Sequence, residues 1–102
     1  QEIDDYSTFL ERAYKECASL LFQSITEIKK GNVERKVQES IHPVGSYCSA
    51  RKIGDEILDW NQSSREVFNF IRSICEPGPR ARTFCKENEV WINRAELIQN
   101  AE

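Results

Sequence analysis

Residues 47–84 read YCSARKIGDEILDWNQSSREVFNFIRSICEPGPRARTF, and they hold most of the information about the fold. Their centre predicts a helix over residues 64–75. Ser63 and Glu66 form a Ser-x-x-Glu capping box that satisfies free amides at its start. The apolar positions recur at helical spacing, and they are Val67, Phe68, Phe70, Ile71, Ile74 and Cys75.

The end of this stretch predicts a break and then a hairpin. Pro77-Gly78-Pro79 ends the helix, because proline lacks the amide hydrogen and restricts the residue before it. Two expected strands follow, residues 81–85 and 89–93, at hairpin spacing. A two-stranded hairpin alone is marginal in water. We therefore expect the sheet to be incomplete, or to be completed by another part of a longer protein.

The N-terminal part predicts one long helix over residues 5–30. Its apolar residues recur every three or four positions as one stripe. Asp4 or Asp5 is expected to cap its start, and Gly31 its end. Such a helix must pack its stripe against something, and a separate domain is the best-matched partner. Residues 32–46 are polar and predict a linker. The fold class is therefore α+β.

Composition excludes several classes of function. The 102 residues carry a net charge of −3, without the basic surplus of a free-standing nucleic-acid binder. No apolar run approaches the ~20 residues that cross a membrane, and no signal peptide opens the chain. Position 1 is not Met, which fits an excised segment. We expect a cytoplasmic protein.

The residues of catalytic type offer no active site. His42 precedes a proline in the linker and has no partner placed for a metal, so we interpret it as solvated. Ser63 and Ser64 are explained as helix caps. None of the four cysteines is spaced for zinc, and we expect Cys17 and Cys75 to be buried thiols rather than parts of a disulfide framework. No catalytic residue, metal site or cofactor is therefore predicted in this segment.

Six residues form the candidate site, which is either acceptor-binding or structural. Trp60 is expected in the core, stapling the capped helix to its neighbours. The Arg72 head group needs a partner among apolar residues, and Asp59 is the candidate. Basic residues at Arg51 and Lys52, with Arg80 further on, complete the set.

The same stretch resembles a known family. Tyr47-Cys48-Ser49-Ala50-Arg51-Lys52-Ile53, Ile57-Leu58-Asp59-Trp60, Phe70-Ile71-Arg72 and Pro77-Gly78-Pro79-Arg80-Ala81-Arg82-Thr83-Phe84 form an ordered series. This series resembles the C-terminal region of the formyltetrahydrofolate-dependent formyltransferases, a family that includes sugar N-formyltransferases and methionyl-tRNA formyltransferases. The chain departs from the family at Arg80, which stands where a small residue usually precedes the alanine, and at Gly54, where an acidic residue or proline is common.

The resemblance implies a division of the chain and a set of partners. Residues 1–31 would be the last helix of a catalytic α/β domain absent from this sequence, 32–46 the linker, and 47–102 an incomplete C-terminal domain, part of a small open β-barrel. The absent domain would bind formyltetrahydrofolate and carry an Asn, His, Asp trio. This segment alone is expected to transfer no formyl group.

The acceptor is open between two branches. An amino-sugar nucleotide is favoured, because Arg51 occupies the place of a recurrent arginine and the net charge is negative. Initiator tRNA is the alternative. A third reading is a non-catalytic interaction or dimerisation module, which would use the helix stripe and the open sheet edge. A homodimer is compatible with it.

Overall fold

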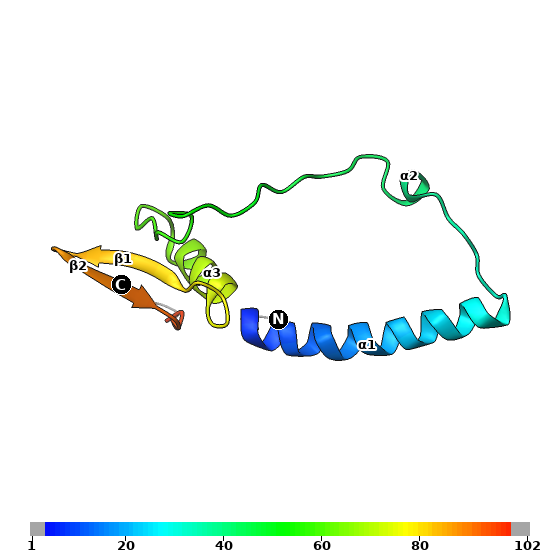
Figure 1. Cartoon of the computed structure of the whole chain (residues 1–102). Helices are drawn as coiled ribbons and strands as arrows, with labels where there is room; N and C mark the ends of the chain where they lie inside the picture. Colours follow the sequence, from blue (N-terminus) through cyan, green and yellow to red (C-terminus); the bar gives the residue numbers. More distant parts are fainter. Residues whose placement is uncertain (1–3, 99–102) are drawn as a thin grey trace. The chain divides into compact units, whose positions relative to one another are not determined.

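The computed structural model describes residues 4–98, and its elements follow one another as α1 (Tyr6–Lys30), α2 (Gln38–Ile41), α3 (Ser64–Ile74), β1 (Ala81–Cys85) and β2 (Asn88–Ile92) (Figure 1). Two compact units divide the chain. We call Gln1–Arg12 with Lys52–Glu102 the hairpin unit, and Ala13–Arg51 the helix–linker unit. The α+β prediction is confirmed, and within residues 4–98 the sheet has two strands and is open.

α1 begins and ends as the sequence predicts. Asp5 caps its start: the Thr8 amide donates to the Asp5 carboxylate at 2.9 Å, and the Asp5 amide donates to the Thr8 hydroxyl at 3.0 Å. At the other end Gly31 adopts a left-handed φ of +76°. The Gly31 amide bonds the Ile28 carbonyl and the Asn32 amide bonds the Glu27 carbonyl, which together make a Schellman C-cap.

The helix–linker unit contains no buried residue. The α1 residues Leu20, Leu21, Phe22, Ile25 and Ile28 are all exposed. Cys17 is exposed as well, so its predicted burial is wrong, because in this unit nothing packs on the stripe that carries it. The expected linker holds the four-residue α2, and His42 is exposed beside it, as predicted.

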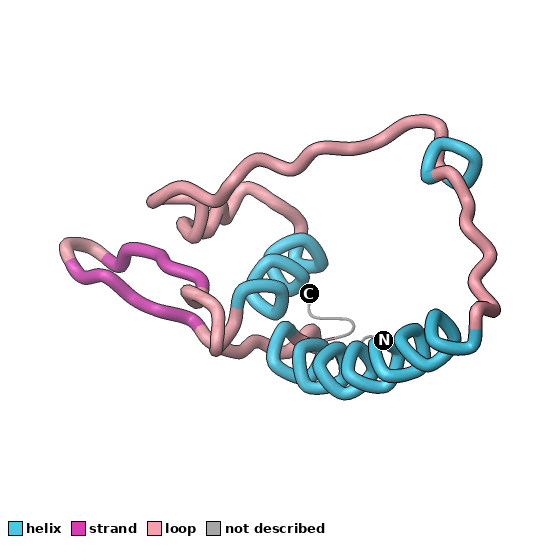
Figure 2. The backbone as a smooth tube through the Cα atoms, turned by 45° about the vertical axis from the view of Figure 1, so that its right-hand side comes forward, coloured by secondary structure: helices cyan, strands magenta, loops and turns pink. Residues whose placement is uncertain are grey.

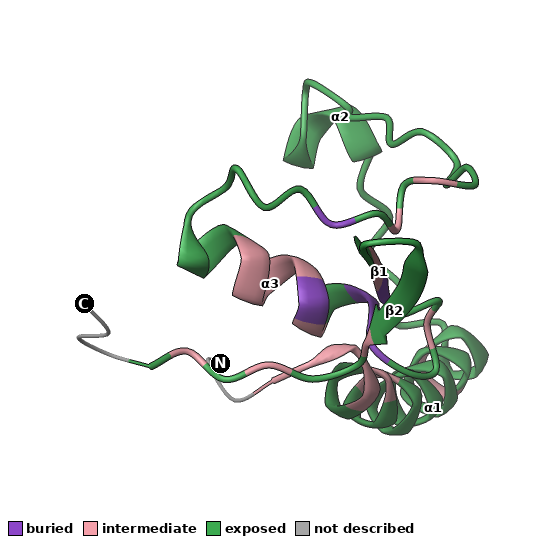
Figure 3. Cartoon of the chain, turned by 90° about the vertical axis from the view of Figure 1, so that its left-hand side faces the viewer, coloured by how far each residue is buried: buried purple, intermediate pink, exposed green. Residues whose placement is uncertain are grey.

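The hairpin unit is built on α3. The Ser63–Glu66 capping box is present in both directions, which confirms the predicted helix start. One side of α3 is buried through Ile71 and Ile74. These side chains form the core with Leu58 and Ala81, and Cys75 is buried beside them. Figure 3 shows the buried segments on α3, on the loop before it and at the start of β1.

The hairpin joins β1 and β2 in antiparallel register, with Ala81 opposite Ile92 and Cys85 opposite Asn88 (Figure 2). β2 begins one residue earlier than predicted. The turn is closed by two residues alone, of which Lys86 takes a left-handed φ of +58°. Outside the two strands, Ile57 forms an isolated parallel bridge with Arg82.

The loop from α3 to β1 is held by its backbone. The Gly78 amide donates to the Cys75 carbonyl at 2.7 Å, and the Arg80 amide donates to the Ile74 carbonyl at 2.8 Å. A Cβ at Gly78 would lie 2.7 Å from the Ile74 carbonyl oxygen and 2.8 Å from that of Cys75. Only glycine therefore lets the chain turn this tightly at the helix end.

We predict that Gly78→Ala lowers the free energy of unfolding by about 1–3 kcal/mol, because backbone atoms must move to admit the methyl group. Urea unfolding measures the change. Gly45→Ala is the matched control, since a Cβ there meets nothing within 4 Å. Equal stability of the two variants would contradict the expectation.

Candidate functional site

The structure separates the six predicted site residues. Arg51 ends the helix–linker unit and Lys52 begins the hairpin unit, and both are exposed. The Lys52 amide donates to the Asp55 carboxylate at 2.7 Å, which fixes the turn that follows. Neither side chain has a hydrogen bond or ion pair with another residue of 4–98. The other four residues lie at three separate places in the hairpin unit.

Asp59 does not pair with Arg72, and this prediction was wrong. The Asp59 carboxylate accepts hydrogen bonds from the backbone and side-chain amides of Asn61, both at 2.9 Å. It therefore stabilises its own turn. Arg72 instead donates from Nε to the Asn69 side chain at 3.0 Å and from Nη1 to the Asp4 carbonyl at 3.1 Å.

Trp60 does not fill the core, contrary to the prediction. Its side chain is 60% exposed. The indole Nε1 donates to the Thr83 hydroxyl on β1 at 2.8 Å, across 23 residues of sequence. The indole N–H therefore links the loop before α3 to the hairpin through a hydrogen bond, and burial of the ring contributes little to this link.

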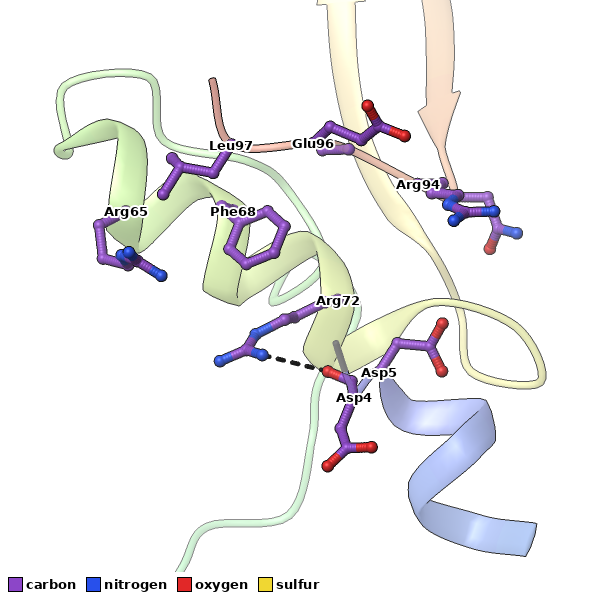
Figure 4. Close-up of a pocket in the computed structure, with 10 residues that line it drawn as sticks. Asp4, Asp5, Arg65, Phe68, Arg72, Arg94, Glu96 and Leu97 are labelled. Carbon is purple, nitrogen blue, oxygen red and sulfur yellow. Dashed lines mark hydrogen bonds between the residues drawn. The ribbon is translucent and has the colours of Figure 1, made fainter. Parts of the chain in front are cut away.

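Arg72 lies in a cavity of about 290 Å³ beside α3 (Figure 4). Arg65, Phe68 and Arg72 extend from α3 on one side, and the Arg72 guanidinium stacks 5.1 Å from the centre of the Phe68 ring. The remaining walls come from the segments before α1 and after β2, and include Asp4, Asp5, Arg94, Glu96 and Leu97.

The charges of this cavity balance, with three arginines and three carboxylates in its lining. Asp4 forms an ion pair with Arg12 at 2.7 Å, and Asp5 is engaged in the α1 cap. A balanced cavity does not concentrate a free anion. We interpret it as the joint that holds the start of α1 against α3.

Arg82 is the residue that the sequence reasoning missed. Its guanidinium bonds Glu56 at 2.7 Å and Glu89 at 2.9 Å, and the Arg82 and Glu56 side chains are only 16% and 12% exposed. It also stacks on the rings of Phe84 and Trp91. Among residues 4–98 its Nε atom has no hydrogen-bond partner. Arg82 directly faces Trp91 in the observed register. The predicted strand bounds would have paired it with Ile92, so the sequence prediction gave no signal for this contact.

Glu56 has a lowered pKa for three reasons. The backbone amides of Glu56 and Gly54 stabilise its carboxylate, the latter at 2.8 Å, and the Arg82 guanidinium adds attraction. Burial opposes these effects and is outweighed. Glu56 is therefore ionised in the folded unit and remains the partner of Arg82.

Arg80 occupies an unfavourable backbone position. Its φ is +66°, a left-handed conformation that costs an L-residue roughly 1–2 kcal/mol. The guanidinium lies 5.6 Å from the centre of the Trp91 ring, a contact worth about 0.5–1 kcal/mol at an exposed site. The Glu76 pair at 3.5 Å is exposed and adds about 0–1 kcal/mol. These contacts at most offset the backbone strain.

The surface around Arg80 and Arg82 offers guanidinium groups beside the exposed rings of Trp91 and Phe84. Such an arrangement is suited to binding anions and planar groups. The fold is that of a small α+β domain. No helix among the described residues has the length and apolar character to cross a membrane.

Comparison with known proteins identifies the family. The sequence model described as the formyl transferase C-terminal domain matches residues 52–102, which is half of the chain. The chain therefore belongs to the formyl transferase C-terminal domain family, as the sequence resemblance indicated. No solved structure matches this chain.

The curated relatives include three that illustrate the match. The methionyl-tRNA formyltransferase of Sulfurihydrogenibium sp. is 28% identical over 98 residues, which are 96% of this chain and 30% of that protein. That of Fusobacterium nucleatum is 39% identical and covers 78% of this chain and 26% of the relative. That of Halothermothrix orenii is 37% identical and covers 71% of this chain and 22% of the relative. The chain thus spans less than a third of the length of these relatives.

We predict that Trp60→Phe lowers the free energy of unfolding by about 0.5–1.5 kcal/mol, because it removes the indole donor and keeps most of the ring. Thermal unfolding measures it. Thr83→Val removes the acceptor, so the double variant should lose little more than either single one. Fully additive losses would show that the Trp60–Thr83 bond contributes nothing.

We also predict that the free energy of unfolding depends on pH through the ionisation of Glu56. Because its folded-state pKa lies below the ordinary 4.5, its contribution is present above that value and is lost as pH falls through the folded pKa. Unfolding measured from about pH 6 to 3 should show a shallower decline for Glu56→Gln than for the wild type. Glu87→Gln, in the exposed hairpin turn, controls for loss of one carboxylate. Identical declines in wild type and Glu56→Gln would sink this expectation.

Proposed function

We propose that this domain is the acceptor-side part of a methionyl-tRNA formyltransferase. The observation that carries the proposal is the extent of the similarity: proteins named methionyl-tRNA formyltransferase match across 71–96% of the chain, and the matches over 94% and 96% extend well beyond the hairpin unit. The amino-sugar acceptor favoured from the sequence has no comparable support and stays a prediction. Arg51, which favoured it, has no side-chain hydrogen bond or ion pair with another residue of 4–98.

The distribution of charge supports the same acceptor. Ala13–Arg51 holds six of the lysines and arginines and four of the acidic residues, for a net charge of +2. The hairpin unit holds eight lysines and arginines and thirteen acidic residues, for a net charge of −5. Four basic residues lie close together in sequence around the C-terminus of α1: Lys29 and Lys30 in its last turn, and Arg35 and Lys36 after it. Lys30 and Lys36 form exposed ion pairs with Glu27 and Glu34. Such a cluster suits a phosphate backbone, which gains most of its protein affinity from lysine and arginine.

The proposal includes a catalytic domain in the same protein. The exposed stripe of α1 is the surface that we assign to it, because a helix with one apolar face is stable only when that face is covered. Formyltetrahydrofolate would bind in that domain, and no chemical step is assigned to the residues of this chain. The cytoplasmic location and the homodimer expected from the sequence stay predictions.

The direct test is formyl transfer by the full-length gene product. Labelled formyltetrahydrofolate is offered with methionyl initiator tRNA or with an amino-sugar nucleotide, and uncharged tRNA serves as the blank. We expect label on the methionyl-tRNA. Label on the amino-sugar nucleotide alone would overturn the proposed acceptor in favour of the other branch. Turnover on neither would favour a non-catalytic interaction module.

We predict that changing Lys29, Lys30, Arg35 and Lys36 together to glutamine raises the KM for tRNA by about tenfold or more and flattens its salt dependence, because phosphate contacts are lost. The control changes Lys15 and Arg51 to glutamine in the same unit. An unchanged salt slope in the fourfold variant would show that the cluster does not contact tRNA.

A further inference from the structure

Arg80 stands where the backbone favours glycine. Its φ of +66° follows from the loop, because the Gly78 and Arg80 amides both turn back to the end of α3. The next residue, Ala81, is completely buried and begins β1, so the loop cannot relax at this point. Glycine would adopt the same conformation without strain. The side chain must therefore supply the reason for an arginine at this position.

The Arg80 side chain is held in direction and remains accessible. Trp91, across the hairpin, supports the guanidinium at 5.6 Å from the ring centre. Its ion pair is with Glu76 at 3.5 Å, and the two side chains are 44% and 62% exposed. Arg82 stacks on the same ring, but its guanidinium is bonded to two carboxylates, one of them well buried. Of the two arginines on Trp91, Arg80 is the one that can exchange its partner.

The surroundings of Arg80 form an open groove. It is lined by Ser7, Glu76, Pro77, Gly78, Pro79 and Arg80 and has a volume of about 600 Å³. The two prolines and the constrained glycine make this wall rigid. Arg80 thus belongs to the rigid wall of an open groove, and such preorganisation favours binding of an anion.

We propose that Arg80 is an acceptor-binding residue that binds a phosphate group of the acceptor, with Trp91 holding the guanidinium in place. This inference rests on the proposed function, in which the domain faces a phosphate-bearing acceptor. The guanidinium fork matches two phosphate oxygens, and stacking on an indole leaves the N–H edge free to donate. Binding replaces the exposed pair with Glu76 by a phosphate, two of whose oxygens can accept from the guanidinium fork. The backbone strain at Arg80 is then maintained for binding rather than for stability.

The test uses Arg80→Gly and a matched control in the full-length gene product. Lys86→Gly also removes one positive charge at a left-handed residue of the hairpin unit, with φ +58°, and Lys86 has no ring contact within residues 4–98. We expect Arg80→Gly to keep or raise the melting temperature and to weaken tRNA affinity by about tenfold or more, as loss of a charge-assisted bond does. Its plot of log affinity against log salt should lose about one unit of slope. Lys86→Gly should leave affinity and slope unchanged.

Two further variants sharpen the outcome. Arg80→Lys keeps the charge without the planar fork and should restore affinity only partly. Glu76→Gln removes the competing carboxylate and should leave affinity unchanged or raise it. A fall in the melting temperature of Arg80→Gly with unchanged affinity would overturn the proposal and make Arg80 a structural residue. Equal losses of affinity in Arg80→Gly and Lys86→Gly would also overturn it.

Failure of the proposed function is distinguishable from failure of this inference. If the wild type formylates an amino-sugar nucleotide and not methionyl-tRNA, the acceptor assignment fails. The same variants are then assayed with that sugar nucleotide, which carries phosphates too. A raised KM in Arg80→Gly alone would support the phosphate contact, and unchanged KM values in all variants would refute it.

Discussion

Arg82 joins three segments of the hairpin unit through both its backbone and its side chain. Its amide donates to the Glu56 carbonyl and its carbonyl accepts from the Leu58 amide, each at 2.8 Å, so the loop before α3 lies along β1. Its guanidinium then binds Glu56 again and reaches Glu89 on β2. β1 is thereby bonded on both edges, which makes a two-stranded hairpin more stable than it would be alone.

The small core explains why this polar junction matters. The described part of the chain buries Leu58, Ile71, Ile74, Cys75 and Ala81 and little else. A domain of this size gains only modest stability from apolar burial. The bond from Trp60 to Thr83 and the cap at Ser63 act beside Arg82, and each holds a segment that the core does not reach. A partly buried arginine with an unbonded Nε is tolerated there because two carboxylates and two rings surround its charge.

Local sequence patterns predicted the helices and strands well. They did not predict contacts between residues that are distant in sequence. Capping at Ser63, the glycine after α1 and the proline break each depend on a few neighbouring residues, so the sequence alone located both long helices and the hairpin within a residue or so. The Arg82 cluster depends on which residues face each other across the hairpin and the bridge. Trp60 was misplaced for a related reason: its size predicts burial, but its position is set by a single bond to β1.

The net charge of the chain is a poor guide to its partner, because it averages over two units of opposite sign. A phosphate responds mainly to charges within about 8 Å at physiological ionic strength. The local charge of each unit, +2 in Ala13–Arg51 and −5 in the hairpin unit, is therefore the better guide. Within the acidic hairpin unit, an anion can be attracted by a single guanidinium that is held in place and can exchange its partner. The net charge of the unit does not attract it. Arg80 on Trp91 meets that requirement, whereas Arg82, with its paired charge, serves the fold.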